Sequence, residues 1–127
     1  MSKENAGSIK VSELSGALLA LWVARANEWK VEREDESLPD FICWDERGEP
    51  FSFGACGYRP YENWAQGGQI IERECIAIDP LTRSGRKSNH WQAQVWTPYA
   101  VETGETPLIA AMRAYVASKL GDEVELP

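Results

Sequence analysis

The sequence predicts an α+β fold, in which a small antiparallel or mixed sheet packs against two amphipathic helices, one near each end of the chain. Three observations support this class: helical spacing of apolar residues early in the chain, the same spacing late in the chain, and short β-prone runs between them. A chain of 127 residues is long enough to bury one core. We therefore expect a single domain over residues 1–127.

The first predicted helix runs from Ser12, the expected N-cap, to about Trp29. Gly16 lies inside it and costs about 1 kcal/mol relative to Ala, which suggests a close approach of another backbone segment. Residues 30–40 are rich in charge and indicate a solvated connection. The apolar residues of the helix share one face: Leu14, Leu18, Leu21, Trp22 and Trp29.

Short β-prone runs occupy the middle of the chain. Residues 41–44 and 51–53 are separated by a turn-rich spacer, which predicts a hairpin. A further strand is expected between Ile70 and Pro80, followed by a loop over residues 81–89. Residues 90–96 alternate between apolar and polar side chains, so they predict a strand with one face in the core.

The second helix is marked at both ends. Thr106 is the expected N-cap, Pro107 suits the first helical position, and Gly121 closes the helix. Residues 124–126 then either add an edge strand or simply end the chain. The apolar residues of this helix keep helical spacing: Leu108, Ala111, Met112, Tyr115, Val116 and Leu120.

Composition narrows the class of protein. Hydrophobic residues make up 43% and charged residues 26%, as in globular domains, and no apolar run of membrane-spanning length or signal peptide is visible. The cysteines Cys43, Cys56 and Cys75 include no close pair, which fits reduced thiols in a cytoplasm. The net charge of -7 argues against direct binding to nucleic acid or to anionic lipid.

Three stretches, in this order, resemble the NinX-like family of phage and prophage proteins. They are VSELSGALL at 11–19, NWAQGGQIIERE at 63–74 and TPLIAAMRAYVASKLG at 106–121. The chain departs from the family pattern at Gln69, where members often have Pro, and at Cys75, where they often have Gly or Ala. The resemblance implies a short accessory protein that works in the cytoplasm of a bacterial host, and it carries no activity with it.

The best candidate for a ligand or partner site is a loop over residues 58–68. Aromatic rings can stack on a flat ligand, Arg59 can pair with a phosphate or carboxylate, and two glycines let backbone N–H groups approach closely. The alternative is that Tyr61 and Trp64 anchor a compact loop on the core while the glycines make its turn. The candidate residues are Tyr58, Arg59, Tyr61, Asn63, Trp64, Gln66, Gly67 and Gly68.

Other groups are weaker candidates. On an extended segment, Glu72 and Glu74 share one face and can hold a metal or act in acid–base chemistry, although such a pair is more often a solvated strand face. His90 is the only histidine and fits a surface position on a strand. The three cysteines and His90 lack the paired spacing of structural zinc sites, so we expect inert thiols, no metal and no cofactor.

These observations favour a non-enzymatic phage protein. We expect it to bind a host protein or a small anionic molecule such as a nucleotide-like signal, because the aromatic and arginine-containing loop is the main chemical feature. One alternative is a metal-dependent or acid–base enzyme that uses Glu72, Glu74 and His90. Another is a structural protein of a phage assembly.

Overall fold

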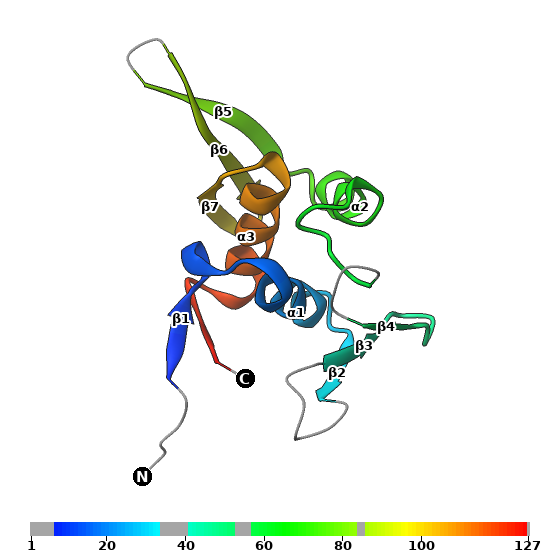
Figure 1. Ribbon diagram of the computed structural model, residues 1–127. Helices are drawn as coiled ribbons and strands as arrows, with labels where there is room; N and C mark the ends of the chain where they lie inside the picture. Colours follow the sequence, from blue (N-terminus) through cyan, green and yellow to red (C-terminus); the bar gives the residue numbers. More distant parts are fainter. Residues whose placement is uncertain (1–6, 34–40, 53–56, 84–85, 127) are drawn as a thin grey trace.

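Figure 1 shows the computed structural model, which describes residues 7–33, 41–52, 57–83 and 86–126. It has the predicted α+β class. No helix in these ranges is long and apolar enough to cross a membrane. The helices are η1 (a 3₁₀ turn, Val11–Glu13), α1 (Gly16–Ala26), α2 (Trp64–Glu74) and α3 (Pro107–Leu120). The strands are β1 (Ser8–Lys10), β2 (Lys30–Arg33), β3 (Phe41–Trp44), β4 (Pro50–Ser52), β5 (Ala77–Arg83), β6 (Arg86–Trp96), β7 (Tyr99–Gly104) and β8 (Glu123–Glu125).

The described strands form three small antiparallel sheets rather than the single sheet that we expected. Their orders are β5-β6-β7, β2-β3-β4 and β1-β8. Helix α3 packs against all three strands of the first sheet on one side and against α1 and α2 elsewhere (Figure 1). The main body of the fold has three layers in the order β5-β6-β7 sheet, α3 and α1. The β2-β3-β4 sheet lies beyond the end of α1.

The predicted late helix is confirmed in position and in both ends. The Thr106 hydroxyl accepts a hydrogen bond from the backbone N–H of Ile109 at 3.1 Å, Pro107 opens the helix, and Gly121 adopts a positive φ of 96° just after it. Its burial is not one-sided, however, because small residues on the remaining faces are also covered. Those additional buried residues are Ala110, Ala114, Ala117 and Ser118.

Helix α1 is shorter than predicted. The chain forms the η1 turn, becomes extended at Leu14 and enters α1 after Ser15, so Ser12 is not its N-cap. Gly16 has a φ of +55°, and a Cβ there would meet nothing within 4 Å. The expected close approach at Gly16 is therefore wrong, and the backbone conformation accounts for the glycine instead. The helix ends at Ala26, which leaves Trp29 outside it.

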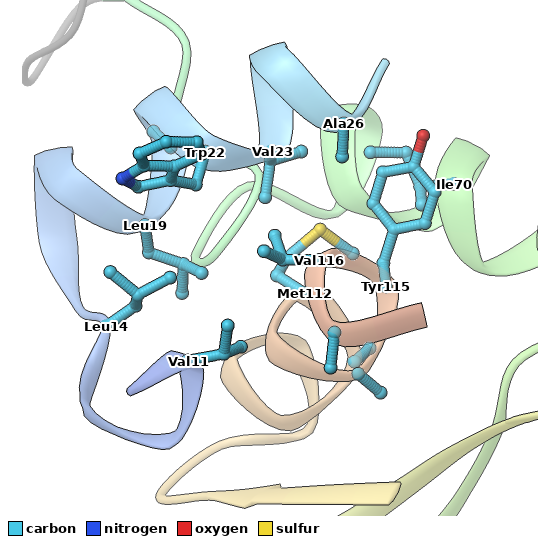
Figure 2. Close-up of a cluster of buried hydrophobic side chains, with 14 of the residues drawn as sticks. Val11, Leu14, Leu19, Trp22, Val23, Ala26, Ile70, Met112, Tyr115 and Val116 are labelled. Atoms are coloured by element: carbon cyan, nitrogen blue, oxygen red, sulfur yellow. The ribbon is translucent and has the colours of Figure 1, made fainter. Parts of the chain in front are cut away.

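Side chains of α1 and α3 meet in the main core, as Figure 2 shows. Leu21, Met112 and Tyr115 are buried, and Leu18 is partly buried against the same cluster. Most of the apolar residues predicted for the two helices are therefore at least partly buried, but the helices are not one-sided as we expected. Other faces of both are covered as well, and Leu120, assigned to the core face of α3, is 40% exposed. Burial of this kind stabilises the fold by about 25 cal/mol for each Å² of apolar surface removed from water.

The predicted hairpin forms, with β3 and β4 paired around a turn at residues 45–49. The Asp45 carboxylate accepts hydrogen bonds from the backbone N–H groups of Arg47 and Glu49 at 2.9 and 2.8 Å. Phe53, expected in the second strand, lies outside the described residues. Residues 30–33 form β2 instead of a solvated connection, because Val31 packs against the core while its charged neighbours stay exposed. The rest of that expected connection, residues 34–40, also lies outside them.

The central segment departs most from prediction. Residues 64–74 form α2, although we expected a loop that led into a strand from Ile70. Asn63 caps the helix, since its side-chain oxygen accepts hydrogen bonds from the N–H groups of Ala65 (2.8 Å) and Gln66 (3.3 Å). Ile70 is buried, and Cys75 ends the helix in the left-handed conformation. The glycine pair lowers helix propensity and so hides this helix from sequence analysis.

The strands around α3 are longer and more numerous than predicted. Strand β5 begins at Ala77 and continues past Pro80, where its register with β6 shifts, and β6 already begins at Arg86. Most of the expected loop over residues 81–89 is therefore strand. Strand β7 was not predicted. The possible edge strand near the C-terminus is confirmed as β8, which pairs with β1.

Two adjacent glycines of α2 offer a matched test of its packing. A Cβ on Gly67 would overlap the carbonyl oxygen of Pro60 and lie 2.7 Å from Leu108 Cδ2, so Gly67→Ala should lower the free energy of unfolding by about 1–3 kcal/mol. A Cβ on Gly68 meets only Trp64 Cε3, at 3.9 Å. Gly68→Ala should raise stability by up to about 1 kcal/mol. Urea denaturation measures both, and equal effects would contradict the packing described here.

Candidate functional site

A polar cleft lies between the C-terminal end of α1, helix α2 and the turn that joins β3 to β4. It consists of two adjacent cavities of about 170 and 260 Å³, which share the lining residues Asn27, Trp29, Glu46 and Arg73. The first cavity is also lined by Asp45, Arg47, Tyr58, Gln66, Gln69 and Ile70. The second is also lined by Ala26, Glu28, Glu74, Tyr115 and Lys119.

Asn27 is the centre of a hydrogen-bond network at the base of the cleft. Its side-chain oxygen accepts from the Tyr115 hydroxyl at 2.7 Å and from Arg73 Nη2 at 3.1 Å, and its Nδ2 donates to the Tyr58 hydroxyl at 3.1 Å. Arg73 Nη2 also donates to the Tyr115 hydroxyl at 2.9 Å. In this way one amide joins three helices and the segment before α2. Such a satisfied network holds its members in one arrangement.

Both phenols of this network stay protonated at neutral pH. Burial raises the pKa of Tyr58, and the hydrogen bond from Asn27 offsets only part of that rise. Burial likewise raises the pKa of Tyr115, against the opposing effect of Arg73. The two hydroxyls are therefore neutral hydrogen-bonding groups rather than bases.

Glu74 forms ion pairs with two cations at one end of the cleft. One of its oxygens lies 3.0 Å from Arg73 Nε and the other 3.3 Å from Lys119 Nζ. Burial raises the pKa of this carboxyl, but the hydrogen bonds from Arg73 and Lys119 outweigh that effect. The pKa of Glu74 therefore lies below its usual value. Glu74 is thus charged at neutral pH and already paired.

Trp29 forms a wall of both cavities. Its ring centroid lies 4.8 Å from that of Tyr58, with the planes tilted by 46°, and its Nε1 donates to a Glu46 carboxylate oxygen at 2.8 Å. The sequence placed Trp29 on the core face of a helix. In the structure it follows α1 and is only partly buried, because the left-handed Glu28, at φ 65°, turns the chain before it.

Two of the residues predicted from the sequence, Tyr58 and Gln66, line the cleft. Gln66 holds the segment before α2 in place, since its side-chain oxygen accepts from the Arg59 N–H at 2.6 Å and its Nε2 donates to the Gly57 carbonyl at 3.2 Å. Two other predicted residues do not line the cleft. Asn63 caps the start of α2, and Gly67 lies within the helix, packed on Pro60.

The other predicted residues lie elsewhere. Tyr61 and Trp64 line a separate, shallow cavity of about 170 Å³ beside the start of α3, together with Glu62, Thr106, Pro107 and Leu108. Trp64 is 58% exposed there. Arg59 Nη1 lies 3.5 Å from a carboxylate oxygen of Glu62, and Gly68 lies on α2 next to Trp64. The eleven-residue loop is thus divided between two sites.

The residues of the enzymatic alternative do not share a face. Glu72 and Glu74 lie two residues apart on a helix, where side chains at that spacing point in different directions, instead of on the strand that we expected. His90 is exposed on β6. Within the described ranges, no three histidine, cysteine, aspartate or glutamate residues are placed to hold a metal ion.

The described cysteines are free thiols in contrasting settings. Cys43 is buried in β3, and burial together with the nearby Asp45 charge raises its pKa to about 11. Cys75 is exposed at the end of α2. Cys56 lies outside the described residues. A buried thiol with a raised pKa is a weak nucleophile at neutral pH, which fits the inert role predicted for Cys43.

The family model of the NinX protein of bacteriophage P22 matches residues 10–119. The chain belongs to this NinX family. All residues that line the polar cleft fall within the matched region. A comparison with curated proteins gave no match to this chain.

Sequence analysis missed most of the cleft residues, including five that form the hydrogen-bond network and the Trp29 wall. Asn27, Trp29, Glu46, Arg73 and Tyr115 are spread over the whole chain, and no spacing rule relates them. A usable signal was present only for the end of α1, where Asn27 precedes a charged, β-prone segment. Their convergence follows from the packing of α1 and α2 on α3.

Removal of the Tyr115 hydroxyl tests the network. Tyr115→Phe leaves the Asn27 oxygen and Arg73 without one partner each, and should lower the free energy of unfolding by about 1–2 kcal/mol. Tyr99→Phe is the matched control, because Tyr99 is 62% exposed and should change stability by less than about 0.5 kcal/mol. Chemical denaturation measures both variants. Equal stability of Tyr115→Phe and wild type would show that the network contributes nothing.

Proposed function

We propose that this chain is a non-enzymatic accessory protein of phages and that the polar cleft is its ligand-binding site. The observation that carries this proposal is the convergence of polar side chains from three helices and one turn on two joined cavities. Ligand sites are typically concave, with a few polar groups held in fixed positions. Here the Asn27 network supplies the fixed base.

The cleft suits a small molecule that contains a planar polar group. The Trp29 ring offers an aromatic surface, while the exposed Gln69 and the Arg73 guanidinium bring hydrogen-bonding groups to the same cavity. A nucleobase-like ring has the flat shape and the edge donors and acceptors that such walls recognise. The cavities are also small, which favours a compact molecule or a single side chain over a folded surface.

A host protein is the second candidate partner, at a different place. Trp96 and Tyr99 are 61% and 62% exposed at the turn between β6 and β7, and their ring centroids lie 5.5 Å apart. Exposed aromatic residues are enriched in protein interfaces and in their energetic centres. Neither residue lines the cleft, so this contact and ligand binding are compatible.

Thermal melts against a panel of nucleosides, nucleotides, amino acids and amines test the cleft. A compound present at one hundred times its Kd should stabilise the wild type by about 2.7 kcal/mol. Gln69→Ala should reduce the increase in Tm, because Gln69 lines the cavity on an exposed helix face. Gln92→Ala, on β6, is the matched control and should keep the full increase. If no compound stabilises the wild type, or if both variants respond alike, the cleft is not the binding site.

A further inference from the structure

Carboxylates outnumber cationic side chains around the cleft. The acidic members are Glu28, Asp45, Glu46 and Glu74, and the basic ones are Arg47, Arg73 and Lys119. The chain as a whole carries a net charge of -7. The electrostatic potential around the cleft would therefore repel an anionic ligand and attract a cationic one.

The basic side chains on α2 and α3 already have partners. Arg73 and Lys119 both pair with Glu74, and Arg73 also donates to Asn27 and Tyr115. A phosphate that entered the cleft would have to compete with these contacts. The two residues do not form an open anion site.

Within the part of the chain that the structure describes, two carboxylates remain available around the second cavity. Glu46 uses one oxygen to accept the hydrogen bond from Trp29 Nε1, which leaves its other oxygen for a further donor. Glu28 is exposed and lines the same cavity from the end of α1. Trp29 and Tyr115 line the same cavity. Carboxylates beside aromatic rings are the groups that bind ammonium and guanidinium ions.

We infer that the ligand of the polar cleft carries an ammonium or guanidinium group, which binds at the 260 Å³ cavity between Glu28 and Glu46 and against Trp29. This inference rests on the proposed function and specifies its ligand. A guanidinium is planar and pairs with carboxylates through two parallel hydrogen bonds, so it fits these walls especially well. The source is either a free small molecule or an arginine or lysine side chain of a partner.

Isothermal titration at low salt tests the charge of the ligand directly. The probes are N-acetylarginine amide, its uncharged citrulline counterpart, adenosine monophosphate, and a capped pentapeptide with a central arginine. N-acetylarginine amide should bind, the citrulline probe should bind at least about 5-fold more weakly, and raised salt should weaken binding. Tighter binding of the pentapeptide would identify the source as a protein segment, and equal binding would identify a free molecule.

Single substitutions locate the site. Glu46→Gln removes the charge but keeps an oxygen that can accept from Trp29, so the fold should persist, and the Kd for N-acetylarginine amide should rise about 5-fold. Glu28→Gln should act in the same direction. Glu49→Gln, in the same turn but outside both cavities, is the matched control and should leave the Kd unchanged.

The outcomes separate this inference from the proposed function. Equal binding of the arginine and citrulline probes, no effect of Glu46→Gln, or no binding of any cationic probe overturns the cationic ligand. If adenosine monophosphate binds instead and Gln69→Ala weakens it, the cleft is a ligand site and only its assigned charge class is wrong. If neither these probes nor the wider panel bind, both proposals are overturned.

Discussion

Helix α3 is covered by protein along most of its length, and the positions of the other helices and of the largest sheet depend on this burial. The small side chains of the buried alanines at 110, 114 and 117 let the surrounding elements approach the helix closely. On the side toward α1, Met112 and Tyr115 fill the space instead. Arg113 secures the arrangement with polar contacts, since it donates to the carbonyls of Leu14 at 2.8 Å and Thr103 at 2.9 Å. One helix thus positions η1, α1 and β7 together.

The polar cleft is a consequence of the same packing. Tyr115 is a core residue by burial, yet its hydroxyl reaches the end of α1 and satisfies Asn27. A shielded amide without partners would cost about 1–3 kcal/mol. The half-buried Asn27 has its partners because Arg73 of α2 and Tyr115 of α3 donate to it, and Tyr58, before α2, accepts from it. The core and the candidate site therefore share a residue, and the site rests on a base that cannot move independently.

Sequence analysis succeeded where local signals and burial agree. Thr106 and Pro107 mark the start of α3 and Gly121 marks its end, and the hairpin turn contains Asp45 and Gly48 at positions that favour it. It failed for α2, because a pair of glycines is typical of a turn. There, Gly67 is required by the close approach of the Pro60 carbonyl and of Leu108, and no local sequence pattern reveals either contact.

By itself, the sequence determined the class of the fold, the ends of α3, the burial of most of the apolar residues assigned to the core, and the family resemblance. These features depend on helix caps and on the periodicity of apolar residues, and both can be recognised from residues close together in the sequence. Only the tertiary structure decided that Asn27, Trp29, Glu46, Arg73 and Tyr115 form one cleft. Contacts between segments so far apart arise from the packing of whole helices, and no spacing along the chain encodes them.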